Sequence, residues 1–290
     1  MALENTSSTV KLLTIIVIFL RHFSLKNTAK SIKSTFFSSH SITLSFIETE
    51  RTKGAFTIQT LLCLLKISYL CIMILNKETA KQAARFLLQI KAIKLNNESP
   101  FTWASGRKSP IYCDNRVTLS YPDIRTFIRQ QFVAIVNEQF ANVDVIAGVA
   151  TGGIAQGVLV AQDLGKPFVY VRPEEKKHGL GNKVEGDLKS GQSVVVIEDL
   201  ISTGKSSLQV VQTLREAGCS VKGMAAIFNY NLEVEQQAFK TSEVSLNTIT
   251  DYHTLIDIAA EENFIKQEDL VSLTEWRKNP ELWSEQRMNN

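Results

Sequence analysis

Residues 194–197 form a run of four aliphatic side chains that leads into two acids and then into small residues. The stretch reads VVVIEDLISTGKSS over residues 194–207. An unbroken apolar run bounded by a turn-rich segment is typical of a strand buried on both faces of a parallel sheet. A helical pattern begins at Gly204, so the stretch predicts a strand–loop–helix unit. Such units place the loop at the sheet edge where α/β proteins bind ligands.

The same alternation of strands and helices extends over the second half of the chain. The predicted strands are 143–150, 167–172, 193–199 and 220–230, and the predicted helices are 121–140, 152–165, 204–218, 251–262 and 267–278. Pro122 stands near the start of the first helix, and Gly165 and Gly218 end two of the others. This order predicts an α/β fold with a central, mostly parallel sheet flanked by helices.

Residues 198–206 combine groups suited to a phosphate with groups suited to hydroxyls. Glu198 and Asp199 offer carboxylate oxygens to two neighbouring hydroxyl groups, and the small residues after them open a helix whose backbone N–H groups bind anions. The segment is not a P-loop, because Asp199 stands where that motif requires its first glycine. The combination predicts a ribose 5-phosphate site. The alternative is an ordinary helix N-terminus beside incidental acids.

Two other loops are expected at the same edge of the sheet. GVATGG, residues 148–153, contains three glycines that let the backbone approach an anion, which indicates a second phosphate group. Residues 171–186 are long, charged and rich in glycine, which is typical of a mobile lid. Arg172, Lys176 and His178 would close over an anionic leaving group. The alternative for this segment is a solvated charged loop.

These motifs resemble those of a known family. VVVIEDLISTGKSS resembles the phosphoribosyl-pyrophosphate signature of type I phosphoribosyltransferases. FTWASGRKSPIYCDNR (101–116) and YVRPEEKKHGLGNKVEG (170–186) are similar to segments of the orotate phosphoribosyltransferases of many bacteria. The resemblance runs from about Met73 to the C-terminus. It implies the family's fold with a small N-terminal hood, and a role in pyrimidine biosynthesis. The implied reaction joins orotate to the ribose of phosphoribosyl pyrophosphate, with Mg²⁺, and gives orotidine 5′-monophosphate and pyrophosphate.

The resemblance also implies a role for each residue of the signature. Glu198 and Asp199 would hold the ribose hydroxyls, and Ser202 would face the orotate ring. The residues implied for the 5′-phosphate are Thr203, Gly204, Lys205 and Ser206. Protein side chains are not expected to hold the metal ion, because Mg²⁺ binds mainly through the substrate.

The mobile catalytic loop of the family maps onto Arg172, Lys176 and His178. In the family this loop reaches across a dimer into the neighbouring subunit's site, so the resemblance implies a homodimer. Two alternatives stay open: a phosphoribosyltransferase for another base, and a regulator that binds phosphoribosyl pyrophosphate without catalysis.

The chain departs from the family's best-known pattern at several positions. Ala104 and Gly152 stand where many members have lysine, and Pro173 stands where a second loop cation often follows the arginine. The segment after Phe228 lacks an arginine that contacts the orotate carboxylate in some members. We hypothesise that Arg116 makes this contact, because a guanidinium group binds a carboxylate bidentately. The alternative for Arg116 is a surface salt bridge.

Composition excludes several other classes of protein. The net charge of +3 gives no sign of a nucleic-acid-binding protein. The cysteines show neither the spacing of a zinc site nor that of a disulfide framework; they are Cys63, Cys71, Cys113 and Cys219. Reduced thiols are typical of a cytoplasmic protein. We therefore expect no nucleic-acid or membrane partner.

Residues 1–72 differ in composition from the remainder. They contain eight Lys/Arg and three Asp/Glu, whereas residues 73–290 contain 24 and 26. Their apolar run 12–20 is nine residues long, and a bilayer span needs about 20. A signal peptide and a transit peptide are possible interpretations. We favour a third, in which 1–72 is an extension that is disordered or foreign to the native protein, and 73–290 is the phosphoribosyltransferase domain.

Removal of residues 1–72 tests this division. A chain that begins at Met73 should fold and keep full activity, because its core then lies wholly within 73–290. Circular dichroism and orotate consumption, compared with the full chain, measure both properties. Loss of folding in the shortened chain would contradict the division.

Overall fold

The structure is a computed structural model that describes residues 77–103, 105–140, 142–172 and 183–288. These ranges belong to one compact unit of the chain. The parts of the sequence predictions that lie outside them are the extension 1–72 and the residues Ala104, Pro173, Lys176 and His178. Within the described ranges, no helix has the length and apolar character needed to cross a bilayer.

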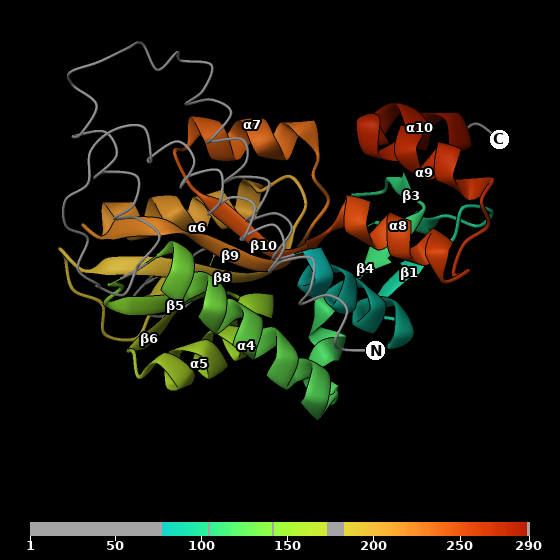
Figure 1. The fold of residues 1–290 in the computed structure, drawn as a ribbon. Coiled ribbons are helices and arrows are strands. Elements are labelled where there is room, and N and C mark those ends of the chain that lie inside the picture. Colours follow the sequence, from blue (N-terminus) through green and yellow to red (C-terminus); the bar gives the residue numbers. More distant parts are fainter. Residues whose placement is uncertain (1–76, 104, 141, 173–182, 289–290) are drawn as a thin grey trace, which may run out of the picture. The chain divides into compact units, whose positions relative to one another are not determined.

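A six-stranded sheet lies at the centre of the described chain (Figure 1). Its strands are β5 (Val145–Val149), β6 (Phe168–Val171), β7 (Val184–Glu185), β8 (Ser193–Ile201), β9 (Ser220–Asn229) and β10 (Leu246–Asp251). They follow the order β10-β9-β8-β5-β6-β7, and all neighbours are parallel except β6 and β7. The predicted mostly parallel α/β sheet is confirmed.

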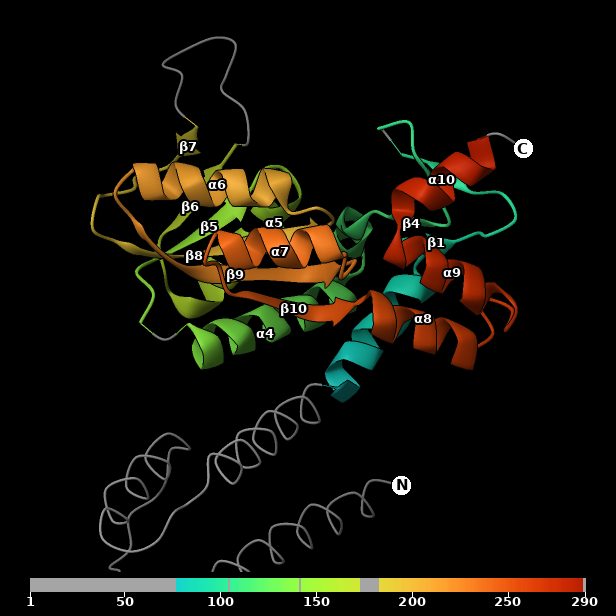
Figure 2. The same ribbon diagram turned by 90° about the horizontal axis from the view of Figure 1, so that it is seen from above.

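Helices cover both faces of this sheet (Figures 1 and 2). Those on one face are α4 (Pro122–Gln139) and α5 (Gly152–Leu164); those on the other are α6 (Lys205–Glu216) and α7 (Glu233–Thr241). Side chains of a strand alternate between its faces, so Val195 and Ile197 join the core beneath α4, whereas Val194 and Val196 join the core beneath α6. The apolar run of β8 is therefore buried on both sides, as predicted.

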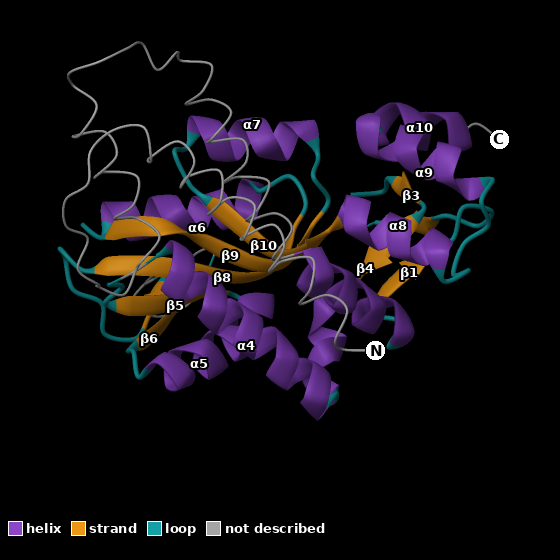
Figure 3. Cartoon of the chain, in the orientation of Figure 1, coloured by secondary structure: helices purple, strands orange, loops and turns teal. Residues whose placement is uncertain are grey.

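A smaller group of elements, called the hood here, combines two distant parts of the chain. Its N-terminal part consists of a helix over 77–89, strands β1 (Ile93–Leu95), β2 (Phe101–Thr102), β3 (Lys108–Ser109) and β4 (Ile111–Cys113), and the short helix η1 (Asn115–Ser120). Its C-terminal part consists of α8 (Tyr252–Glu261), α9 (Asp269–Lys278) and α10 (Pro280–Met288) (Figure 3).

Contacts between α10 and β3 join these two parts. The backbone N–H of Lys108 donates to Ser284 Oγ at 2.8 Å, and Arg107 pairs with Glu281. The resemblance implied a small N-terminal hood, and the structure has one. The C-terminal helices α8, α9 and α10 complete it.

Several observed elements were not predicted. β10 is an edge strand in which only Ile249 and Thr250 are buried, so its sequence lacks the apolar run that marks a central strand. α7 is nine residues long and mostly polar, and it buries only Glu235 and Phe239. β8 continues to Ile201 rather than ending at Asp199. This last difference changes how the two acids are presented.

Glu235 is a buried carboxyl on the face of α7 that packs on the sheet. The residue is 3% exposed, and its Oε2 atom has no hydrogen-bond partner among the described residues. Burial raises the pKa of this carboxyl to about 7. The folded state thus holds a proton on Glu235 that the unfolded chain releases at lower pH.

Glu235→Gln should change how stability depends on pH. Between its ordinary pKa of 4.5 and about 7, the folded state binds the extra proton, so the free energy of unfolding falls as pH rises. Glutamine does not titrate and so removes this loss. Above neutral pH, the free energy of unfolding of the variant should exceed that of the parent by on the order of 1–3 kcal/mol. Thermal unfolding at about pH 5 and about pH 8 measures the difference. A difference that is the same at both pH values would contradict the assignment.

Candidate active site

The carboxyl end of β8 presents Glu198 and Asp199 on opposite faces of the sheet. Both residues belong to the strand, and consecutive strand side chains point to opposite sides. Glu198 is 5% exposed, whereas Asp199 is half-buried. The sequence placed both acids at the end of the predicted strand, where they would face one ligand together; in the structure Asp199 is the more exposed of the two.

Glu198 binds groups of the protein itself. Its Oε2 accepts a hydrogen bond from Ser207 Oγ of α6 at 3.0 Å, and its Oε1 accepts one from the backbone N–H of Asp199 at 2.9 Å. Burial, followed by the neighbouring charge of Asp199, raises the pKa of Glu198 well above its ordinary value. A ribose hydroxyl would reach Glu198 only if these internal partners were exchanged.

Asp199 is held closely on several sides. A Cβ atom at Gly152, the first residue of α5, would lie 2.2 Å from Asp199 Cγ. The carbonyl oxygen of Asp199 accepts a hydrogen bond from Asn115 Nδ2 at 2.6 Å. The lysine that many relatives carry at the position of Gly152 would therefore have to displace the Asp199 carboxylate from its observed position.

The turn after β8 leads directly into α6. Ser202 and Thr203 are half-buried, and Lys205 and Ser206 are exposed. Gly204 has a φ of 76°, and a Cβ there would lie 2.7 Å from the ring of Phe239, so both conformation and space require glycine. No described side chain caps the N-terminus of α6. Its first N–H groups therefore have no side-chain partner among the described residues, and the phosphate site predicted here stays a prediction.

A second helix N-terminus lies on the other side of the β8 end. α5 follows β5, which pairs with β8 in parallel, and the peptide bond between Ala150 and Thr151 is cis. A Cβ at Gly153 would lie 2.3 Å from the carbonyl oxygen of Ile197. The start of α5 also lacks a side-chain cap from the described residues. The end of β8 thus contacts the starts of two helices, α5 through Asp199 and α6 through Glu198, and each helix N-terminus attracts negative charge.

Arg116 forms a bidentate ion pair with Asp114. Its Nε lies 2.6 Å from Asp114 Oδ1 and its Nη2 lies 2.9 Å from Asp114 Oδ2. The pair lowers the pKa of Asp114. Asp114 raises the pKa of Arg116, and Asp199 adds to this rise, which places Arg116 within electrostatic range of the site. In the structure, the Arg116 guanidinium therefore makes a surface salt bridge, which was the alternative to the hypothesised contact with orotate.

Arg172 lies at the end of β6, where the predicted lid begins. Its Nε is 3.6 Å from Glu185 Oε1, and its guanidinium carbon is 5.9 Å from the centre of the Tyr170 ring. Lys176 and His178 fall outside the described residues, so their predicted roles stay predictions.

Sequence reasoning missed four residues around this site. Asn115 and Ser207 are buried and hold Asp199 and Glu198 respectively. Tyr230, just after β9, packs against Trp103 of the hood with ring centres 5.6 Å apart. The sequence contains one weak signal for these contacts: residues 113–115 lie inside one of the motifs. The spacing of the residues did not indicate which of them would be in contact.

The site fits a magnesium ion that is bound largely by substrate. Within the described residues there is no group of three or more His, Cys, Asp or Glu side chains that could hold a metal alone. Asp199 offers one half-exposed carboxylate. Mg²⁺ commonly binds through one or two carboxylates together with water and substrate phosphates. The single half-exposed carboxylate of Asp199 could supply the protein part of such a donor set.

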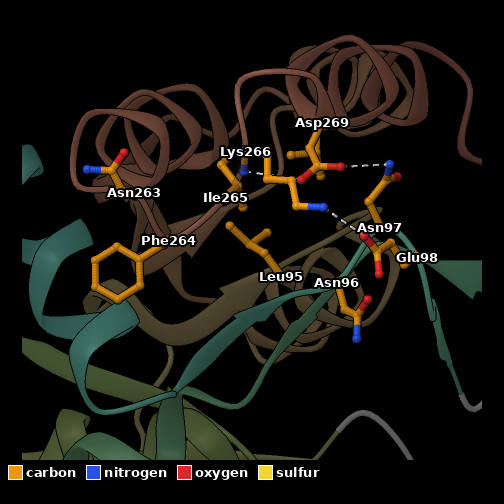
Figure 4. A pocket seen from close by; sticks show the side chains of 10 residues that line it. Leu95, Asn96, Asn97, Glu98, Asn263, Phe264, Ile265, Lys266 and Asp269 are labelled. Carbon is orange, nitrogen blue, oxygen red and sulfur yellow. Dashed lines mark hydrogen bonds and ion pairs between the residues drawn. The ribbon is translucent and has the colours of Figure 1, made fainter.

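A cavity of about 340 Å³ lies elsewhere, in the hood, between the segment after β1 and the connection from α8 to α9 (Figure 4). Its polar and charged groups bind one another: Lys266 Nζ lies 3.0 Å from Glu98 Oε1, and Asn97 Nδ2 donates to Asp269 Oδ1 at 3.1 Å. The cavity shares no lining residue with the loops at β8.

The sequence is similar to those of known phosphoribosyltransferases. The phosphoribosyl transferase domain family matches residues 123–259. An orotate phosphoribosyltransferase of Bacteroides fragilis is 53% identical over 207 residues, which cover 71% of this chain and 98% of the relative. One of Listeria innocua is 52% identical over 203 residues, which cover 70% and 97%. The chain belongs to the orotate phosphoribosyltransferase family.

A solved structure of the same family supports the assignment. The orotate phosphoribosyltransferase from Aeropyrum pernix is similar to this chain with a TM-score of 0.55 and 29% identity, over 63% of this chain and 99% of that one. The type I phosphoribosyltransferase fold and the family inferred from the three motifs are both confirmed.

Gly152→Ala tests the close contact with Asp199. The added methyl group must displace the Asp199 carboxylate, so the KM for phosphoribosyl pyrophosphate should rise about tenfold or more, the equivalent of about 1.4 kcal/mol. Gly165→Ala is the control. Gly165 ends α5 with a φ of 61° and open space around it, so this variant should lose stability without a change in KM. Equal KM values in both variants would count against the contact.

Proposed function

We propose that this member of the orotate phosphoribosyltransferase family transfers ribose 5-phosphate from phosphoribosyl pyrophosphate to orotate at the carboxyl end of β8. One observation supports this site above the others: the carboxyl end of β8 contacts the starts of two uncapped helices, α5 through the half-exposed Asp199 and α6 through Glu198. A carboxylate suits the ribose hydroxyls, and two helix N-termini suit two separate phosphate groups. A sugar with a phosphate at one end and a pyrophosphate at the other requires this combination.

In this proposal the signature residues bind the ribose and its phosphate. Asp199 accepts hydrogen bonds from the ribose hydroxyls, and Glu198 joins it once Ser207 is released. Ser202 faces the orotate ring. The 5′-phosphate is bound at the start of α6 by Thr203, Gly204, Lys205 and Ser206.

The remaining residues bind the two other charged groups. The pyrophosphate lies at the start of α5, beneath the lid cations Arg172, Lys176 and His178. Arg116 exchanges Asp114 for the orotate carboxylate, which has the same bidentate geometry. The exchange conserves one ion pair, so binding requires little new desolvation of the guanidinium group.

The reaction depends mainly on the stabilisation of charge. The ring N–H of orotate loses its proton to solvent or to the departing pyrophosphate, and its nitrogen forms a bond to the anomeric carbon while the bond from that carbon to the pyrophosphate oxygen breaks, so that the electron pair leaves with pyrophosphate. Positive charge develops on the sugar beside Asp199, and negative charge develops on the leaving group beside α5 and the lid. Groups that are already oriented toward such charges stabilise the transition state most effectively. Closure of the lid excludes water that would otherwise hydrolyse the sugar.

Three further parts of the proposal concern the metal, the assembly and the compartment. Mg²⁺ would bind through substrate oxygens, with Asp199 available to the ion or its water ligands, and would neutralise the departing charge. Two copies of the chain would form a homodimer in which each lid serves the neighbouring site. The enzyme would act in the cytoplasm.

A panel of bases tests the reaction. The full chain, supplied with phosphoribosyl pyrophosphate and Mg²⁺, should release pyrophosphate with orotate and not with uracil, adenine or hypoxanthine, and EDTA should stop the release. Arg116→Ala should raise the KM for orotate about tenfold, because one bidentate ion pair is lost. Asp114→Asn, which frees Arg116, is the matched control and should not raise it.

Each contrary result points to a different alternative. Turnover with another base would indicate a different phosphoribosyltransferase. Donor binding without turnover on any base would indicate a regulator. An unchanged KM for orotate in Arg116→Ala would remove that residue alone from the proposal.

A further inference from the structure

Asn115 joins the hood to the end of β8. It begins η1, directly after hood strand β4, and is 1% exposed. Its Nδ2 donates a hydrogen bond of 2.6 Å to the backbone carbonyl of Asp199, 84 residues further along the chain. Its Oδ1 accepts a hydrogen bond from Cys113 Sγ at 3.2 Å. Both ends of the buried amide are therefore occupied.

These two partners permit only one orientation of the amide. The carbonyl of Asp199 can only accept, so it requires the NH₂ group of Asn115. The thiol of Cys113 serves as the donor, so it requires the amide oxygen. Burial raises the pKa of Cys113 well above its ordinary value, which keeps the thiol protonated. A reversed amide would place two oxygen acceptors against each other and lose both bonds.

The bond from Asn115 completes the set of contacts that fix Asp199. The backbone N–H of Asp199 is bound by Glu198 Oε1, and its carboxylate lies against Gly152. Those two contacts come from the strand and from α5. The carbonyl, in contrast, is bound from the hood. Rotation of the peptide after Asp199 would swing its side chain, and Asn115 opposes that rotation.

We infer that Asn115 is a positioning residue for the phosphoribosyl donor: through the carbonyl of Asp199 it sets the carboxylate that binds the ribose hydroxyls. The inference rests on the proposed function, which assigns those hydroxyls to Asp199. Asn115 itself touches neither the donor nor the base. Its effect should therefore appear in donor binding and not in the use of orotate.

Asn115→Asp is the most direct test, because it replaces only the donating NH₂ group. The new carboxylate cannot donate to the Asp199 carbonyl and repels it. The KM for phosphoribosyl pyrophosphate, and its Kd measured by calorimetry with Mg²⁺, should rise about tenfold or more, equivalent to about 1.4 kcal/mol. The KM for orotate should stay within about threefold of the wild-type value.

Asn97→Ala separates positioning from simple stabilisation of the hood. Asn97 donates to Asp269 and accepts from Ser272 Oγ at 2.7 Å, so it joins hood segments without touching β8. This control should lower the unfolding temperature and leave the Kd for the donor unchanged. If Asn115→Asp also changed only the unfolding temperature, Asn115 would be a structural tie and the inference would be overturned.

Cys113 provides a second pair of variants that does not alter Asn115. Cys113→Val removes the donor that orients the amide and should raise the Kd for the donor about two- to fivefold; Cys113→Ser keeps an O–H donor and should restore it. Should Asn115→Asp not fold, this pair decides: equal donor affinities in the two variants would overturn the inference. Wild-type turnover with orotate in the same assay separates this failure from failure of the proposed function.

Discussion

The start of α5 approaches the end of β8 so closely that a side chain at either of its first two glycines would force neighbouring atoms to move, and the observed geometry of the site depends on this contact. Cβ atoms at Gly152 and Gly153 would lie 2.2 Å from Asp199 Cγ and 2.3 Å from the Ile197 carbonyl oxygen. The two glycines therefore bring a helix N-terminus against a carboxylate. The positive end of α5 offsets part of the charge of Asp199, and a ligand with both hydroxyls and phosphates can then bind at one place.

The division of the two acids between opposite faces of β8 limits the negative charge of the site. Glu198 is turned inward to Ser207, and its raised pKa favours the neutral form. Asp199 is the more exposed of the two acids, and in the proposed function it is the carboxylate that the donor meets first. One exposed carboxylate repels a donor with three phosphate groups less than two would. Burial of Glu198 is thus an electrostatic property of the site as well as a packing contact.

The sequence predicted the central strands, the helices around them and the loops that follow β5 and β8, because long apolar runs and helical periodicity are local signals. It predicted neither β10 nor α7, because an edge strand and a short polar helix carry little of either signal. The bond between Asn115 and Asp199 joins residues 84 positions apart. Only tertiary packing creates such a contact, so the motifs that contain both residues gave no indication of it. The structure is compatible with both roles that the sequence suggested for Arg116, the salt bridge and the contact with the orotate carboxylate. Asp114 binds the same guanidinium group that orotate would bind.

The hood is closed by residues that are synthesised long after the strands they cover. Lys108 binds Ser284, which lies 176 positions later in the chain. During synthesis, the sheet from β5 to β10 can therefore assemble while β3 still lacks its contacts with α10, and α10 docks after the sheet has formed. Nascent chains that stall before α10 would contain a folded central sheet and an incomplete hood.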